Sequence, residues 1–166
     1  MRANFKYYLD LISNLIINSN LDEISVESTH VPSFQALSVS GADVTLPSNS
    51  GRFLMLDFWS SWCPPCVQEA SILASTYLEY ADRRVEFVGV AIWDEKMEVT
   101  RFVERFGATY PNGVDARGGV AIGYGVRGIP EKFFIDGQGR IVRKFVGPAS
   151  AEKLRAIIDE LLSMEG

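Results

Sequence analysis

Both cysteines of the chain lie in one short segment, WCPPC, at residues 62–66. A bond between cysteines with this C-x-x-C spacing closes a very small loop, so it removes little conformational entropy from the unfolded chain. A chain of 166 residues is also long enough to bury a core without such a bond. The spacing of Cys63 and Cys66 therefore favours reversible thiol–disulfide chemistry over a structural disulfide.

The neighbouring residues predict different roles for the two thiols. Cys63 stands where a helix begins, because Pro64 and Pro65 suit the first turn of a helix and not its interior. Unpaired backbone N–H groups and the helix dipole favour a thiolate there, so we expect the pKa of Cys63 to lie below about 8.5. We expect Cys66 to be more buried and to keep its proton longer. Cys63 would then attack a substrate disulfide, and Cys66 would resolve the mixed disulfide.

Metal binding is the main alternative for the two thiols. A zinc site needs about four ligands, and the chain adds a single histidine, His30. A c-type haem requires C-x-x-C-H, but Val67 follows Cys66. A copper site formed by the thiols and His30 stays open, although the position of His30 beside a proline is typical of a solvated loop. We therefore expect no metal and no cofactor beyond the dithiol.

An aspartate interrupts the apolar run FLMLDFW at residues 53–59. On a strand, Asp57 points to the same face as the apolar residues two positions away on either side. An ionised carboxylate is costly on a buried face, so burial should raise the pKa of Asp57. A carboxylate of raised pKa is the proton acceptor that Cys66 needs when it becomes a thiolate. A solvated aspartate at the end of the strand is the alternative.

Hydrophobic periodicity predicts the elements that position these residues. Apolar runs at 53–59 and 85–92 predict two buried strands, which pair in parallel through a right-handed crossover helix. Helical spacing predicts two further helices, one ended by Gly107 and the last opened by Ser150. Two strands joined by residues 136–139 predict an antiparallel hairpin. The order β-α-β-α, a short irregular stretch and β-β-α indicates an α/β fold, a mixed sheet with helices on both faces.

Two local signals refine the predicted sheet. The segments FQALSV and DVTL flank Ser40 and Gly41, and this pattern predicts a small hairpin before the core. Arg143 and Lys144 lie in the second strand of the later hairpin. Charged side chains protect a sheet edge from pairing with another chain, so these two residues suit an edge strand.

The first thirty residues carry a weaker pattern. Apolar residues at helical spacing predict a short amphipathic helix at residues 8–16, and residues 21–30 are polar, as expected for a linker. A docking helix and the remnant of a removed anchor are the alternatives. Asp10 interrupts the apolar stretch that a secretory signal needs. We therefore predict an N-terminal extension at residues 1–29 and one main domain at residues 30–166.

The composition excludes some partners. Hydrophobic residues make up 47% of the chain and charged residues 22%, as in an ordinary globular protein. The net charge of −5 gives no electrostatic support for binding nucleic acid. No apolar run approaches the roughly 18 residues that a membrane-spanning helix needs. We therefore expect neither a nucleic-acid partner nor a transmembrane span.

Two segments of the chain carry a family resemblance. The segment LDFWSSWCPPCVQE at residues 56–69 resembles the active-site segment of the thioredoxin superfamily. Its W-C-P-P-C form is similar to that of extracytoplasmic TlpA/ResA/CcmG-type thiol-disulfide oxidoreductases. The segment YGVRGIPEKFFIDGQGRIV at residues 124–142 resembles the same branch, in which G-x-P-E-x-F-x-I-D-x-x-G carries a cis-proline. The resemblance covers residues 31–162 and implies a thioredoxin-like fold with a small N-terminal hairpin.

The resemblance also implies a substrate-binding surface. It predicts a cis bond before Pro130, which would pack beside the disulfide and present the backbone of Ile129 to an extended substrate segment. Trp62 and Pro64 would flank the same surface, with simple packing as the alternative for Trp62. Glu131, directly after the proline, is either a substrate contact or an ordinary surface residue.

Two carboxylates gain predicted roles from the resemblance. Thioredoxins have a buried aspartate six residues before the first cysteine, where this chain has Asp57. Many TlpA/ResA-type proteins have asparagine there, so Asp57 departs from that branch. Glu69 matches an acidic residue that ResA-like proteins use to tune the cysteine pKa values and to contact the substrate. An ordinary place on the helix surface is the alternative for Glu69.

The function implied by the resemblance is a thiol-disulfide oxidoreductase that reduces protein disulfides outside the cytoplasm. By family analogy, its substrates would be apocytochrome c thiols, copper-site cysteines or other envelope proteins, and a membrane electron donor would re-reduce the dithiol. Two alternatives stay open. One is a general cytoplasmic thioredoxin that depends on a reductase, which Asp57 would fit. The other is a non-enzymatic thioredoxin-fold module whose thiols bind metal or hold a partner. The direction of electron flow does not follow from the sequence.

Overall fold

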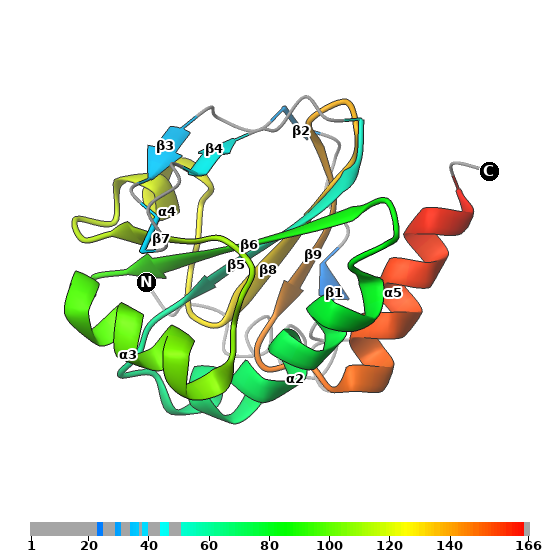
Figure 1. The fold of residues 1–166 in the computed structure, drawn as a ribbon. Coiled ribbons are helices and arrows are strands. Elements are labelled where there is room, and N and C mark those ends of the chain that lie inside the picture. The colour runs from blue at the N-terminus through cyan, green and yellow to red at the C-terminus, as the bar shows by residue number, and fades with distance from the viewer. Residues whose placement is uncertain are drawn as a thin grey trace, which may run out of the picture.

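A mixed sheet of seven strands forms the middle layer of the fold (Figure 1). The structure is a computed structural model that describes residues 23–24, 29–30, 34–36, 38–39, 44–46 and 51–164. The strands of this sheet are β1 (Glu23–Ile24), β2 (Thr29–His30), β5 (Phe53–Trp59), β6 (Val85–Ile92), β7 (Asn112–Asp115), β8 (Glu131–Ile135) and β9 (Arg140–Val146). Their order is β1-β9-β8-β5-β6-β7, and β2 also pairs with β9. The apolar run of β5 therefore lies inside the sheet, with a neighbour on each side.

The helices of the described residues are α2 (Pro64–Tyr80), α3 (Lys96–Phe106), α4 (Gly119–Gly123) and α5 (Ala151–Ser163). Two predicted helix ends are confirmed. Gly107 follows α3 in the left-handed region with a φ of 66°, and its N–H bonds to the carbonyl of Val103. Ser150 precedes α5, and its side chain accepts the N–H of Lys153.

The predicted order of elements is confirmed, and the stretch predicted as irregular adds a strand and the short helix α4. β5 and β6 pair in parallel around the crossover helix α2, and β8 and β9 form the antiparallel hairpin. The stretch predicted as irregular contains a third parallel strand, β7, which pairs with β6. The sequence of β7, NGVD, holds a single strongly apolar residue and no alternation, so periodicity did not reveal it.

The N-terminal part of the sheet differs from the prediction. β1 and β2 both pair antiparallel with β9, where a linker and a loop at His30 were expected. β1 pairs with the end of β9 and β2 pairs with its beginning, so β9 lies between other strands. The prediction from Arg143 and Lys144 that this strand is the edge of the sheet is therefore wrong. The small hairpin is confirmed, because β3 (Phe34–Ala36) pairs antiparallel with β4 (Val44–Leu46). The helix predicted at residues 8–16 lies outside the described residues.

The alternating side chains of β5 divide the core between the two faces of the sheet. Leu54, Leu56 and Phe58 pack with residues of the β3–β4 hairpin and α4. Phe53 and Met55 pack with residues of α2 and α5 on the opposite face. The predicted helices on both faces of the sheet are therefore confirmed, and Asp57 shares the face covered by α2.

Gly89, next to Asp57 in the sheet, allows a close approach that a side chain would prevent. A Cβ atom there would lie 2.7 Å from Trp59 Nε1 and closer still to Asn112 Oδ1, whose amide is held by two hydrogen bonds to backbone carbonyls. We expect Gly89→Ala to lower the free energy of unfolding, measured in urea, by about 1–3 kcal/mol. Gly119→Ala, at a position with open space, should cause no loss. An equal loss in both variants would contradict this account.

Candidate active site

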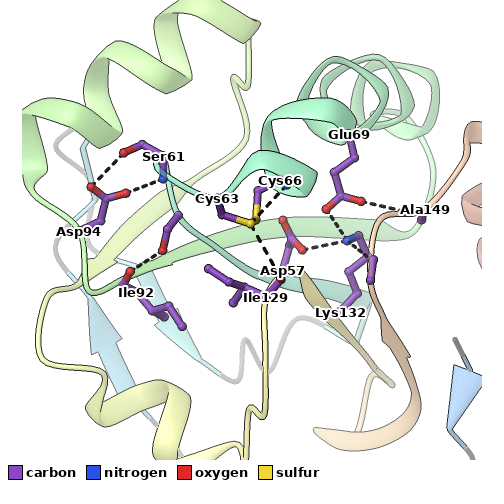
Figure 2. The surroundings of a disulfide bond; sticks show 12 residues. Asp57, Ser61, Cys63, Cys66, Glu69, Ile92, Asp94, Ile129, Lys132 and Ala149 are labelled. Atoms are coloured by element: carbon purple, nitrogen blue, oxygen red, sulfur yellow. Dashed lines mark hydrogen bonds and ion pairs between the residues drawn. A yellow bond between two sulfur atoms is a disulfide. The ribbon is translucent and has the colours of Figure 1, made fainter.

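The cysteine pair lies where α2 begins, next to the end of β5 (Figure 2). Cys63 is the residue before the helix, and its Sγ accepts a hydrogen bond from the N–H of Cys66 at 3.3 Å. Pro64 and Pro65 occupy the first two helical positions, as predicted. The two sulfurs form a disulfide bond, with Cα atoms 5.3 Å apart. Cys63 therefore has the predicted position at the free N–H groups of a helix.

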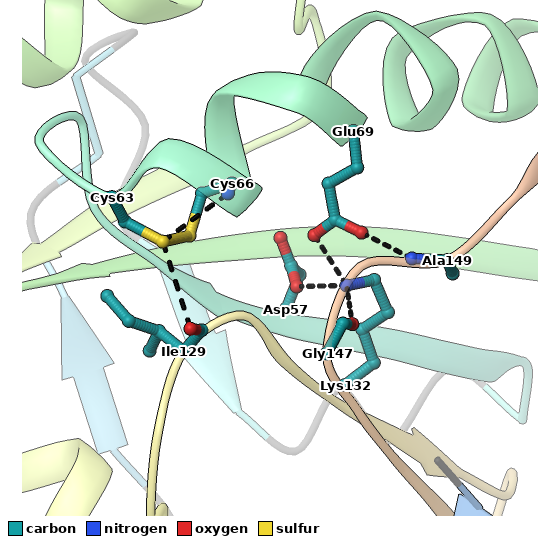
Figure 3. A network of polar contacts seen from close by, with 8 residues as sticks. All are labelled: Asp57, Cys63, Cys66, Glu69, Ile129, Lys132, Gly147 and Ala149. Atoms are coloured by element: carbon teal, nitrogen blue, oxygen red, sulfur yellow. Dashed lines mark hydrogen bonds and ion pairs between the residues drawn. A yellow bond between two sulfur atoms is a disulfide. The ribbon is translucent and has the colours of Figure 1, made fainter.

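Burial does not distinguish the two cysteines in the disulfide form. Cys63 is 3% exposed and Cys66 is 2% exposed, so the greater burial expected for Cys66 is not seen. Their positions relative to the helix differ instead. The sulfur of Cys63 accepts the helix N–H and faces the loop before β8 (Figure 3).

The loop before β8 contains the predicted cis bond, between Ile129 and Pro130. The carbonyl oxygen of Ile129 lies 3.8 Å from Cys63 Sγ, so this loop contacts the disulfide. Gly147 donates its N–H to the carbonyl of Pro130 at 2.8 Å. Ile129 is half-buried and Pro130 is buried. Part of Ile129 is therefore accessible beside the sulfur, where the resemblance predicts the substrate backbone.

Glu131 lies beneath this loop and holds it. Its Oε2 accepts the N–H groups of Arg127 at 3.0 Å and Gly128 at 3.3 Å, and its Oε1 pairs with Lys144. The exposed fraction of Glu131 is 0%. A side chain without exposed surface cannot touch a docked substrate, so the predicted substrate contact does not fit this position. The hydrogen bonds of Glu131 to Arg127 and Gly128 fix the backbone that leads to Pro130.

A buried carboxylate also holds the loop before the cysteines. Asp94 accepts the backbone N–H of Ser61 at 2.6 Å and its hydroxyl at 3.1 Å (Figure 2). Trp62, the next residue, is exposed, so the alternative of simple core packing is wrong for it. Pro64 is exposed as well. The predicted substrate-facing residues Trp62 and Pro64 therefore both lie on the surface.

A buried cluster of three charges lies beside the disulfide. Lys132 Nζ pairs with Asp57 Oδ1 at 3.2 Å and with Glu69 Oε1 at 2.6 Å. Glu69 Oε2 accepts the N–H of Ala149 at 2.8 Å. The exposed fraction of each of the three residues is 1% or less, so a solvated Asp57 and a surface Glu69 are both wrong alternatives. Figures 2 and 3 show Asp57 between the disulfide and the Lys132 ammonium group.

The cluster holds two carboxyl groups for one ammonium group, and this imbalance shifts their proton affinities. Burial raises the pKa of Asp57, although the nearby charge of Lys132 opposes the shift. Burial, and then the charge of Asp57, raise the pKa of Glu69 to about 7. Burial alone would lower the pKa of Lys132, but the two carboxylates outweigh it and raise that pKa. Lys132 therefore stays charged, and the carboxyl groups can hold one proton near neutral pH.

Sequence reasoning missed Lys132 and Asp94. Lys132 opens the apolar run KFFI and lies directly across from Asp57 in the sheet. A charge within a buried strand is the signal that pointed to Asp57, so the same argument applied to Lys132 would have found it. Asp94 carries no such signal, because polar residues are ordinary where a strand ends.

The described residues contain no group of three or more histidine, cysteine, aspartate or glutamate side chains arranged to hold a metal ion. None of the helices in that part of the chain is both long enough and apolar enough to cross a membrane.

The chain is similar to known proteins over most of its length. A family model described as Redoxin matches residues 26–162. Thiol-disulfide oxidoreductase ResA of Geobacillus thermodenitrificans is 30% identical over 138 residues, which cover 83% of this chain and 79% of the relative. ResA of Bacillus anthracis is 29% identical over 131 residues, which cover 78% and 75%. The residues matched by the family model include the cysteines, the cis-proline loop and the charged cluster.

Solved structures show the same similarity. A thiol:disulfide interchange protein of the thioredoxin family from Chlorobium tepidum is 27% identical, with a TM-score of 0.74. That match covers 84% of this chain and 99% of the solved structure. StoA from Bacillus subtilis is 29% identical with a TM-score of 0.67, and the match covers 75% and 95%. The predicted thioredoxin-like fold is therefore confirmed.

Proposed function

Since this chain belongs to the Redoxin family and is a thiol-disulfide oxidoreductase of the TlpA/ResA/CcmG-like branch of the thioredoxin superfamily, we propose that it reduces disulfide bonds of protein substrates with Cys63 and Cys66. The position of the Cys63 sulfur carries this proposal. It lies at the first N–H groups of α2 and against the cis-proline loop. One sulfur is therefore both activated and placed beside a surface that can hold an extended chain.

In the first step, the thiolate of Cys63 attacks one sulfur of the substrate disulfide. A bond forms between Cys63 and that sulfur while the substrate S–S bond breaks, and the other substrate sulfur leaves as a thiolate that takes a proton from water. The N–H of Cys66 and the positive end of the α2 dipole stabilise the attacking thiolate. This stabilisation gives the attacking role to Cys63.

In the second step, Cys66 resolves the mixed disulfide. Its thiol loses a proton to the Asp57–Lys132–Glu69 cluster, and the resulting thiolate attacks the sulfur of Cys63. The bond to the substrate breaks, the second substrate sulfur is released, and the Cys63–Cys66 disulfide forms. The dithiol has then given two electrons to the substrate, and an external donor must return them. The steps need no other cofactor.

The remaining residues hold the substrate or position the site. We assign to Ile129 the backbone contact with an extended substrate segment, because its carbonyl borders Cys63 and part of it is accessible. Pro130 in its cis form directs that carbonyl toward the disulfide. Trp62 and Pro64 complete the surface around the sulfur. Glu131 is a positioning residue, which acts through the loop that it holds.

The proposed place of the reaction is outside the cytoplasm, with a membrane electron donor. The W-C-P-P-C form and the similarity to ResA support this branch. Apocytochrome c thiols, copper-site cysteines and other envelope proteins are the candidate substrates by family analogy. The cytoplasmic alternative rests on Asp57, the aspartate that thioredoxins share at this position.

The equilibrium of the Cys63–Cys66 pair in glutathione buffers tests the direction of electron flow. We expect a reduction potential of about −250 mV or lower, in the range of thioredoxin at about −270 mV. A value near about −120 mV, typical of a strong oxidant, would contradict reduction of substrates. An insulin-reduction assay with the same preparation should show turnover, and its absence would contradict the activity as a whole.

A further inference from the structure

Two tryptophans near the disulfide keep more than half of their surface exposed. Trp62 is 57% exposed and Trp93 is 56% exposed. The indole Nε1 of Trp62 donates to the backbone carbonyl of Trp93 at 3.2 Å, so the two loops are joined. Tryptophan is enriched at interfaces, and two exposed tryptophans joined next to the reactive sulfur therefore indicate a binding surface there.

The backbone holds the side chain of Trp93 in a defined place. Its φ of 50° lies in the left-handed region, which a bulky residue rarely adopts. The indole lies on Gly118, where a Cβ atom would be 2.9 Å from its Cε2 and closer still to its Nε1. Asp94, the next residue, accepts the N–H groups of Ser61 and Glu95 and so ties the Trp93 loop to the cysteine loop. This arrangement keeps the ring on the surface.

The two tryptophans lie along the edge of the sheet where the parallel strands end. Trp62 follows β5, Trp93 follows β6 and Gly118 follows β7, and these strands are neighbours in that order. Ligands of open α/β sheets bind outside this edge. β8, which follows Pro130, lies on the other side of β5. A segment that passes from the proline loop over Cys63 therefore continues toward Trp62 and Trp93.

We propose that Trp93, together with Trp62, docks an aromatic or aliphatic side chain that flanks the cysteine of an extended substrate segment. The proposal rests on the proposed function, because the segment must present its disulfide to Cys63. Two indole rings offer flat apolar faces and no charge, so they favour an apolar side chain over a charged one. Trp93 is then a specificity-determining residue of the reduction.

Two peptide disulfides test this proposal, with phenylalanine or serine next to the cysteine and otherwise the same sequence. We expect the wild-type protein to reduce the phenylalanine peptide with a kcat/KM about tenfold higher. Trp93→Asn should remove this preference, because asparagine tolerates the left-handed backbone without offering a ring. Trp93→Phe should keep most of the preference. Leu78→Asn, which changes an exposed apolar residue at the far end of α2, should keep all of it.

The outcomes separate this proposal from the proposed function. A wild-type protein that reduces both peptides at equal rates, or a Trp93→Asn variant that keeps the preference, would overturn the docking surface and leave the activity intact. A wild-type protein that reduces neither peptide would overturn the proposed function instead. Loss of the preference in Leu78→Asn as well would show that the effect is not specific to Trp93, and would also overturn the docking surface.

Discussion

Replacing Cys63 with serine is expected to abolish disulfide reduction, with a fall in kcat/KM of more than about a thousandfold. The serine hydroxyl is not ionised at neutral pH, so the N–H groups at the start of α2 have no thiolate to stabilise. It also cannot form the sulfur–sulfur bond of the mixed disulfide. Insulin reduction measures the loss, and urea unfolding of the reduced proteins shows whether the fold is kept.

Cys66→Ser is the matched variant, because it removes one sulfur from the same helix and keeps the first step. We expect it to accumulate a covalent complex between Cys63 and a substrate peptide, visible by mass spectrometry without reductant. Cys63→Ser should form no such complex. The opposite result, with the complex formed through Cys66, would reverse the roles assigned to the two cysteines.

The parts of the site that sequence reasoning found are those with local signals. Two prolines after Cys63 predicted where α2 begins, and the helix starts there. A glycine and a serine predicted the ends of two other helices through their capping chemistry. The cis bond before Pro130 came from the resemblance, since most X-Pro bonds in folded proteins are trans.

The parts that it missed depend on contacts between distant segments. β7 has too few apolar residues to show a period, and its parallel pairing with β6 makes it a strand. β1 and β2 are two residues each, too short for any pattern, and they exist through pairing with β9. Glu131 looks like a surface residue in sequence, but it is fully buried and pairs with Arg127, Gly128 and Lys144.

The charged cluster also depends on contacts between distant segments. Sequence reasoning predicted one buried carboxylate, whereas the structure brings Asp57 and Glu69 to the same ammonium group of Lys132. Tyr110, buried nearby, stays neutral because burial and the two carboxylates raise its pKa. Lys132 is therefore the cation that balances the two carboxyl groups. The proton that these carboxyl groups can take up is the one that Cys66 loses during resolution.

This balance predicts how stability depends on pH. The pKa of Glu69 rises from its usual 4.5 to about 7, so the folded protein binds a proton that the unfolded chain has lost. The stability that this proton contributes is complete below about pH 4.5 and is lost as the pH rises through about 7. The expected decrease in the free energy of unfolding from Glu69 is about 3 kcal/mol across this range.

Replacing Lys132 with methionine is expected to lower the free energy of unfolding by about 3–5 kcal/mol at pH 8. Methionine fills a similar volume, but Asp57 and Glu69 lose the ammonium group that lies 3.2 Å and 2.6 Å from their oxygens. At pH 5 the loss should be smaller, because in the variant the carboxyl groups take up protons and become neutral. Urea unfolding at the two pH values measures the difference.

The triple variant Asp57→Asn/Glu69→Gln/Lys132→Met separates charge from volume. It removes all three charges with little change in shape, so we expect it to recover most of the stability that Lys132→Met loses at pH 8. It should also lose the fall in stability between about pH 4.5 and 7, because no buried carboxyl group remains in the cluster. An equal loss in Lys132→Met at both pH values, without recovery in the triple variant, would mean that Lys132 stabilises the fold through packing. Lys132 would then not control the protonation of Asp57 and Glu69, and the proposed proton transfer from Cys66 to the cluster would lose its support.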